Sequence, residues 1–142
     1  ECPYDGHVPP GEVARVAARL RDLGCYEISL GDTIGQAMPE GTDAMLQAVL
    51  AEVPAERLAG HFHDTSGRAL DNIEVALERG LRVFDAAVGG LGGCPYAPGA
   101  AGNVATEAVA ERLATLGYET GLDMDVIADA AAMARDMRIE RA

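Results

Sequence analysis

The chain contains no lysine and no tryptophan, and its 142 residues carry a formal net charge of −12. Its 11 basic residues are all arginine and stand against 23 acidic ones. This acidic excess argues against a binder of nucleic-acid phosphates, which needs a basic face, and against attachment to an anionic membrane. No apolar run reaches the roughly 20 residues of a membrane-spanning helix. These absences favour an ordinary folded domain, since half of the residues are hydrophobic (49%).

Cysteine is also scarce, with Cys2, Cys25 and Cys94 as the three in the chain. An odd and sparse set indicates a reducing compartment rather than a disulfide-bonded scaffold. Arginine without lysine, beside abundant alanine and glycine, is typical of a GC-rich bacterial genome, so we expect a bacterial cytoplasmic protein. The opening residues, Glu1 to Tyr4, form neither a signal peptide nor a natural start, and we expect a fragment or a processed chain.

Helix and strand signals alternate along the chain. Short apolar runs predict strands at 25–30, 58–63 and 83–88. Apolar residues at helical spacing, bounded by proline, glycine or capping residues, predict five helices. This alternation predicts βαβ units and a parallel sheet. The predicted helices run from Pro9-Pro10 to Gly24, from about Thr42 to Val53, from near Gly67 to Gly80, from near Asn103 to Gly117, and from Asp123 to about Arg138.

The number of strands limits the architecture. Three clear βα units and the tail of a fourth are too few for a (β/α)8 barrel, which takes about 250 residues. The chain is therefore either a small open sheet or the second half of a barrel. Polar and reactive side chains lie at the C-terminal ends of the predicted strands, namely Asp32 after the first, His61 and His63 on the second, and Cys94 after the third. Parallel α/β folds bind ligands at this edge of the sheet.

Two histidines lie one residue apart in the sequence His61-Phe62-His63-Asp64. Residues two apart on a strand point to one face, so both imidazoles can reach one divalent cation. Carboxylate, amide or water oxygens must complete such a site, and this mixed set suits Mg²⁺, Mn²⁺ or Fe²⁺ better than structural zinc. The alternative is a pair of polar strand-end residues that face water.

Four glycines in five residues, 89–93, precede Cys94. Their backbone can bend and approach a ligand closely, and nothing bulky shields the thiol. A nearby metal or histidine would make this thiol a nucleophile or a proton donor. The alternative is a flexible turn with an incidental cysteine. No lysine follows the glycines, so the loop is not a phosphate loop of the Walker type.

Three other polar residues have two interpretations each. Asn103 either caps the helix that follows or turns its amide oxygen toward a cation. Glu107 lies one helical turn later on the same face, and is either a solvated residue or part of the same site. Asp32 follows the first strand and is either a turn former or a site residue.

Together, these strings resemble one family. The segments 25–35 (CYEISLGDTIG), 61–65 (HFHDT), 90–97 (GLGGCPYA) and 102–107 (GNVATE) stand in order with fitting gaps. They are similar to the C-terminal half of the 3-hydroxy-3-methylglutaryl-CoA lyases, in the metal-dependent lyase and Claisen-condensing TIM-barrel superfamily. The resemblance covers nearly all of the chain, and the glycine loop ending in Cys-Pro-Tyr is its most specific part.

This resemblance implies a fold and a reaction. The chain, 1–142, would be a single partial domain, the C-terminal half of a (β/α)8 TIM barrel, with roughly barrel units 5 to 8 and a C-terminal helix. The family cleaves 3-hydroxy-3-methylglutaryl-CoA into acetyl-CoA and acetoacetate with a divalent cation, Mg²⁺ or Mn²⁺. By the same resemblance, His61, His63 and Asn103 would be metal ligands, and His61 would also move a proton. Cys94 would be the catalytic thiol on a mobile loop. Asp32 and Glu107 would support the site.

The resemblance also implies what this chain lacks. The family's metal site uses an aspartate from the first barrel strand, and an arginine beside it handles the substrate. Neither has a counterpart here, so we expect the chain alone to be inactive and to need the N-terminal half of the barrel or self-association. Two other interpretations stay open, namely a related metal-dependent aldolase or acyl-CoA condensing enzyme, and a non-catalytic fragment that is stable only in an assembly.

Overall fold

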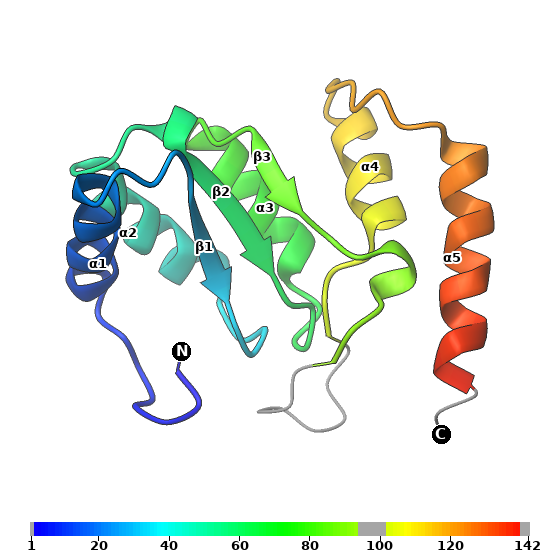
Figure 1. Cartoon of the computed structure of the whole chain (residues 1–142), viewed down its shortest axis with the longest axis horizontal. Helices are drawn as coiled ribbons and strands as arrows, with labels where there is room; N and C mark the ends of the chain where they lie inside the picture. The colour runs from blue at the N-terminus through cyan, green and yellow to red at the C-terminus, as the bar shows by residue number, and fades with distance from the viewer. Residues whose placement is uncertain (1, 94–101, 140–142) are drawn as a thin grey trace.

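The computed structural model describes residues 2–93 and 102–139 and shows a parallel α/β arrangement (Figure 1). Its three strands form one sheet in the order β1-β2-β3, with both pairs parallel. The predicted alternation of strands and helices is therefore confirmed. The elements in chain order are α1 (Pro10–Asp22), β1 (Ile28–Asp32), α2 (Pro39–Leu50), η1 (Ala55–Arg57), β2 (Leu58–Phe62), α3 (Ala69–Glu78), β3 (Val83–Asp85), η2 (Val88–Gly90), α4 (Thr106–Thr115) and α5 (Met124–Ile139).

The first strand begins later than the sequence pattern predicted. The predicted run 25–30 included Cys25, but the N–H of Cys25 donates to the carbonyl of Leu20 and closes the end of α1. Gly24, with a φ of 90°, makes this closure possible because the left-handed conformation costs glycine little. The backbone becomes free to pair with a neighbouring strand only at Ile28.

Two predicted helix starts were also wrong. We expected Thr42 to cap the second helix, but α2 begins at Pro39, whose fixed φ suits the first turn. Thr42 is instead buried inside the helix. Likewise, the fourth helix begins at Thr106 and not near Asn103, because the residues before it are tied to the end of β2.

The two faces of the sheet differ in composition. Ile28, Leu30, Leu58 and Phe62 are buried in one apolar cluster with residues of α1, α2 and α3. The alternate residues point to the other face, where the strand register aligns them in two rows. One row contains Ser29, Ala59 and Val83, and the other contains Gly31, His61 and Asp85. Ser29, His61 and Asp85 thus lie together on the face that the three helices leave uncovered.

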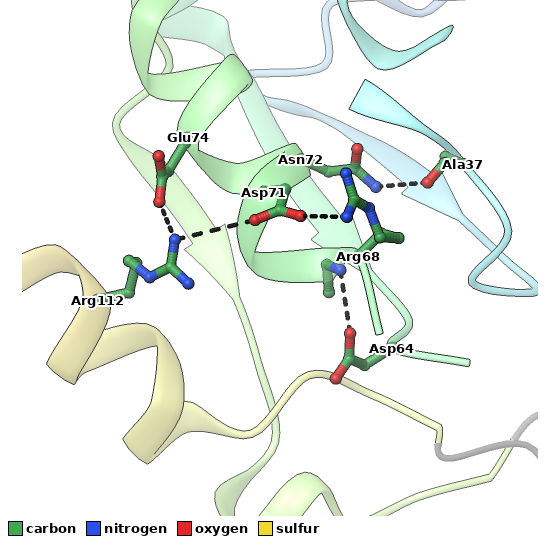
Figure 2. Close-up of polar contacts among 8 residues, drawn as sticks. Ala37, Asp64, Arg68, Asp71, Asn72, Glu74 and Arg112 are labelled. Carbon is green, nitrogen blue, oxygen red and sulfur yellow. Dashed lines mark hydrogen bonds and ion pairs between the residues drawn. The ribbon is translucent and has the colours of Figure 1, made fainter. Parts of the chain in front are cut away.

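Polar contacts on both sides of α3 fix its position beside the sheet (Figure 2). Asp64 accepts the N–H of Ala69 at 3.0 Å and so caps the start of the helix. Asn72 donates to the carbonyl of Ala37 at 2.9 Å, which ties the loop after β1 to α3. On the other side, Arg112 of α4 pairs with Glu74. These contacts hold the loops at the carboxyl edge of the sheet in a fixed relation.

Both outer strands border an open groove. A groove of about 520 Å³ lies between α1 and β1, and one of about 680 Å³ lies between β3 and α4. Within the described residues, no further strand of the sheet pairs with the outer edge of β1 or β3. In the same part of the chain, no helix combines the length and hydrophobicity needed to cross a membrane.

Candidate functional site

His61 and His63 mark the carboxyl end of β2, and both rings lie on the same side of the sheet, as their spacing predicted. The ring centroids are 5.1 Å apart, with an angle of 65° between the planes. His63 is buried, whereas the side chain of His61 is 33% exposed. Two imidazoles at this separation can converge on one cation.

The environment of His63 favours the neutral form of its imidazole. Burial lowers the pKa of His63, the nearby His61 lowers it further, and the carboxylate of Asp32 offsets part of this decrease. Its Nδ1 atom is buried and has no hydrogen-bond partner within the described residues. A neutral imidazole with an unused nitrogen is the form that ligates a metal.

Asn103 lies beside His63 because the chain returns to the end of β2. The two residues form an isolated antiparallel bridge. Around that bridge, the N–H of Asp64 donates to Gly102 at 2.8 Å and the N–H of Val104 donates to Phe62 at 3.1 Å. These backbone bonds leave Asn103 just before α4 and not at its N-cap, which is Ala105. The capping interpretation of Asn103 was therefore wrong.

The side chain of Asn103 leaves one oxygen unused. Its Nδ2 donates to the carbonyl of Leu91 at 3.1 Å, whereas its Oδ1 is buried and has no hydrogen-bond partner among the described residues. Gly92 allows this approach, because a Cβ there would lie 2.9 Å from Nδ2 of Asn103. Gly102 is needed for the same reason, since its Cβ would lie 1.9 Å from the carbonyl oxygen of Gly92.

The unused atoms fit a divalent cation. Nδ1 of His63 and Oδ1 of Asn103 are one nitrogen and one oxygen donor on neighbouring segments. Both atoms are buried and have no hydrogen-bond partner in the part of the chain that the structure describes. A buried polar atom without a hydrogen bond is unfavourable unless a ligand satisfies it. Among the described residues, no three His, Cys, Asp or Glu side chains converge to hold a metal. An octahedral cation would therefore need oxygens beyond these donors.

His61 has a partner that the sequence analysis did not single out. Its Nδ1 pairs with Oδ1 of Asp85, and the other oxygen of Asp85 lies 3.4 Å from the hydroxyl of Ser29. All three residues lie on the uncovered face of the sheet, one on each strand. The signal was present in the sequence, because Asp85 alternates with Val83 on the third predicted strand and faces the same way as the histidines.

Of the two interpretations of Asp32 that the sequence left open, its contacts support the turn former. It is buried, and its two oxygens accept the N–H groups of Gln36 at 3.2 Å and Ala37 at 2.9 Å. It therefore forms the turn after β1. Its charge also offsets a smaller part of the decrease in the pKa of His63 that burial and His61 cause.

Glu107 contacts the start of the glycine segment. Its Oε2 accepts the N–H of Gly89 at 3.0 Å, and its Oε1 lies 3.9 Å from a guanidinium nitrogen of Arg135. Gly89 has a φ of 63° and packs so closely on α5 that a Cβ would lie 3.0 Å from that of Ala134. Glu107 thus fixes the turn from which the glycine segment departs. Cys94 lies outside the described residues.

Three comparisons with known proteins agree with one another. Residues 1–134 match the family described as HMGL-like. The chain is 57% identical over 129 residues to the 3-hydroxy-3-isohexenylglutaryl-CoA/hydroxy-methylglutaryl-CoA lyase of Pseudomonas aeruginosa, covering 91% of this chain and 43% of that protein. It is 54% identical over 127 residues to the hydroxymethylglutaryl-CoA lyase of Pseudomonas mevalonii, covering 89% of this chain and 42% of that protein.

The structural comparison extends this likeness to the fold. The crystal structure of the HMG-CoA lyase from Brucella melitensis matches with a TM-score of 0.95 and 62% identity, covering 97% of this chain and 49% of that chain. The chain therefore spans less than half the length of the relatives it matches. Its sheet and helices form part of a TIM barrel, which confirms the predicted fold class.

Proposed function

This chain belongs to the HMGL-like family, and from that premise we propose that the protein it forms cleaves 3-hydroxy-3-methylglutaryl-CoA into acetyl-CoA and acetoacetate. The proposal is supported by the sequence identity to named lyases and by the donor atoms at the end of β2. Such a carbon–carbon lyase would serve leucine degradation and ketone-body formation. The bacterial relatives and the scarce cysteines support a bacterial cytoplasmic enzyme.

The metal site that we propose uses His61, His63 and Asn103. The two imidazoles would supply nitrogens and Asn103 would supply Oδ1, and we propose Mg²⁺ or Mn²⁺ because the set mixes nitrogen with oxygen. When bound, such a cation acidifies the C3 hydroxyl of the substrate and fixes its orientation. The remaining ligands, and the group that handles the thioester, would come from the rest of the barrel.

The role of His61 is limited by its contact with Asp85. Because Nδ1 is engaged, both metal binding and proton transfer would have to use Nε2. One atom cannot do both at once. We therefore propose that His61 accepts a proton only when its Nε2 is not a ligand, and that His63 and Asn103 hold their positions throughout.

The acid–base groups of the reaction are proposed on the family resemblance. Cleavage leaves an acetyl-CoA enolate, which needs a proton from a positioned acid, and Cys94 is the candidate. Asp32 would support the site through its charge on His63. Glu107 would support it by holding the turn before the glycine segment.

We propose that this chain needs a partner, because three strands do not close a barrel. The occupant of the two open grooves would be the rest of the same barrel, and self-association is the other candidate. An assay with 3-hydroxy-3-methylglutaryl-CoA, Mg²⁺ or Mn²⁺ and a thiol reductant tests this, with and without the remaining barrel segment added in trans. Activity that appears only in the mixture supports the proposal, and absence of activity from a demonstrated complex contradicts it.

Two substitutions identify the residues within the active complex. His63→Ala should abolish saturable Mn²⁺ binding measured by electron paramagnetic resonance, because it removes a buried ligand.

Cys94→Ser should reduce turnover while leaving Mn²⁺ binding intact, and Cys2→Ser is its matched control. Equal turnover in the two cysteine variants would remove Cys94 from the mechanism. Cleavage of other acyl-CoA substrates in preference would favour the related aldolase or condensing enzyme.

A further inference from the structure

We propose that Asp85 is a positioning residue that fixes the ring and the tautomer of His61. Asp85 stands on β3 directly opposite His61 of β2 in the parallel register. It contacts Nδ1 of His61 with one oxygen and approaches the hydroxyl of Ser29 on β1 with the other, at 3.4 Å. One side chain thus links all three strands across the uncovered face of the sheet.

The chemistry of the contact determines the tautomer. An ionised carboxylate only accepts hydrogen bonds, so the proton of a neutral His61 ring must be on Nδ1. The lone pair is then on Nε2, the nitrogen on the far side of the ring from Asp85. Metal-binding histidines commonly donate their second nitrogen to a carboxylate, which sets the ring orientation and increases the basicity of the ligating nitrogen.

Stability does not explain this pair well. The side chains of His61 and Asp85 are 33% and 57% exposed, and exposed ion pairs contribute little to folding. Among the described elements, α1, α2 and α3 pack on the opposite face of the sheet, so the pair does not anchor them. Orientation of the imidazole is the effect that such an exposed contact still has.

His63 provides an internal comparison. Its Nδ1 is buried but has no hydrogen-bond partner within the described residues, so it lacks the contact that Asp85 makes with the same atom of His61. The two rings are neighbours, at 5.1 Å between centroids, and they experience the same solution conditions. Because His63 is the more buried of the two rings, the effect of Asp85 is measured by the change at His61 on removal of the carboxylate, with His63 as the internal reference.

The value of this positioning rests on the proposed function, since it prepares Nε2 for a cation or a substrate proton. The test itself needs neither. Long-range ¹H–¹⁵N correlation spectra of the imidazoles, recorded without metal at about pH 8.5 where an ordinary imidazole is neutral, distinguish the two tautomers. In the unmodified chain we expect His61 to show a protonated Nδ1, with its proton shifted downfield by the carboxylate.

Asp85→Ala should return His61 to a mixture of tautomers, remove the downfield proton, and leave the tautomer of His63 unchanged. Ser29→Ala should keep the tautomer of His61, because Ser29 touches only the outer oxygen of Asp85. The proposal is overturned if His61 carries its proton on Nε2 in the unmodified chain, or if Asp85→Ala leaves the spectrum of His61 unchanged. The first of these outcomes needs no variant, so a failure of Asp85→Ala to fold leaves the test intact. Failure of the lyase assay would leave this result standing.

Discussion

The two faces of the sheet are made by alternate residues of the same three strands, yet they differ in almost every physical property. One face carries Ile28, Leu30, Leu58 and Phe62, which pack under helices and are nearly inaccessible to solvent. The other carries Ser29, His61 and Asp85, which contact one another across the strands. Residues one position apart in a strand therefore contribute differently: one to the burial of apolar surface, and the next to polar contacts that face solvent.

This difference shows which substitutions should change the free energy of unfolding and which should change only the candidate site. The covered face supplies the apolar burial that drives folding. The uncovered face supplies few buried contacts, so its polar groups can be arranged for binding. The loops at the carboxyl edge of the sheet have both roles, because their backbone hydrogen bonds join separate segments of the fold and also position His63 and Asn103.

The largest effect is expected on the covered face. Leu58 is 0% exposed, and Leu58→Ala should lower the free energy of unfolding by about 2–5 kcal/mol, since it removes apolar contacts and leaves a cavity. Val83→Ala, on the uncovered face at 43% exposed, should cost less than about 1 kcal/mol. Urea unfolding followed by circular dichroism measures both. Equal losses would show that the two faces are not energetically distinct in this chain.

A second pair of substitutions tests the carboxyl edge. Gly35 has a φ of 65°, and a Cβ there would lie 2.7 Å from the backbone nitrogen of Thr65 and 2.8 Å from the carbonyl oxygen of His63. Gly35→Ala should therefore lower the free energy of unfolding by about 2 kcal/mol or more. It should also shift the amide signals next to His63.

Gly41→Ala is the matched control for that substitution. Gly41 lies in α2 with open space around its Cα, so alanine should raise the free energy of unfolding by about 0.5–1 kcal/mol. Opposite signs for the same chemical change would tie the cost at Gly35 to its positive φ and its contacts with the second loop together. A neutral Gly35→Ala would contradict this account of the edge.

The role of Glu107 can be separated from proton transfer by two variants. Both of its oxygens face groups of the protein, the N–H of Gly89 and the guanidinium of Arg135. If Glu107 holds the turn, Glu107→Gln keeps an acceptor for Gly89 and should retain turnover in the assembled enzyme within about tenfold, or 1.4 kcal/mol. Glu107→Ala removes the acceptor and should lose more. Equal losses in the two variants would favour a charged role in the reaction.

The sequence predicted the pattern of elements and the pair at His61 and His63 well, because both follow from periodicity. Alternation of two residues along a strand needs no knowledge of the neighbours. The start of β1 and the start of α2 were missed because a glycine closure at Gly24 and a proline at Pro39 determined them. Both residues were visible in the sequence, but the apolar pattern of 25–30 and the capping residue Thr42 predicted other starting points.

The contacts of the candidate site were less accessible to sequence reasoning. The pairing of His61 with Asp85 depends on the register between β2 and β3, which the pattern of either strand alone does not contain. The position of Asn103 beside His63 depends on a return of the chain across about 40 residues. Long-range register and chain return are set by packing. The resemblance to a family brought Asn103 together with the histidines, whereas the contact of Asp85 was found only in the structure.

The smallest expected effect concerns the helices that cover the packed face. Arg79, after α3, donates to both oxygens of Asp43 in α2, at 2.6 and 2.8 Å. The hydrogen bond from Arg79 lowers the pKa of Asp43, desolvation opposes this shift, and the charge of Arg79 adds to it. A carboxyl whose pKa is lower in the folded chain stabilises that chain above its unfolded pKa, near 3.9, and the contribution disappears as the pH falls through the folded pKa.

Arg79→Gln should therefore lower the free energy of unfolding slightly at about pH 7, and the variant and the unmodified chain should converge toward about pH 2. Arg15→Gln, which removes the same charge from a residue that contacts Glu12 instead, is the control. A difference for Arg79→Gln that stays constant across this range would mean that the side chain acts through packing and not through the charge of Asp43.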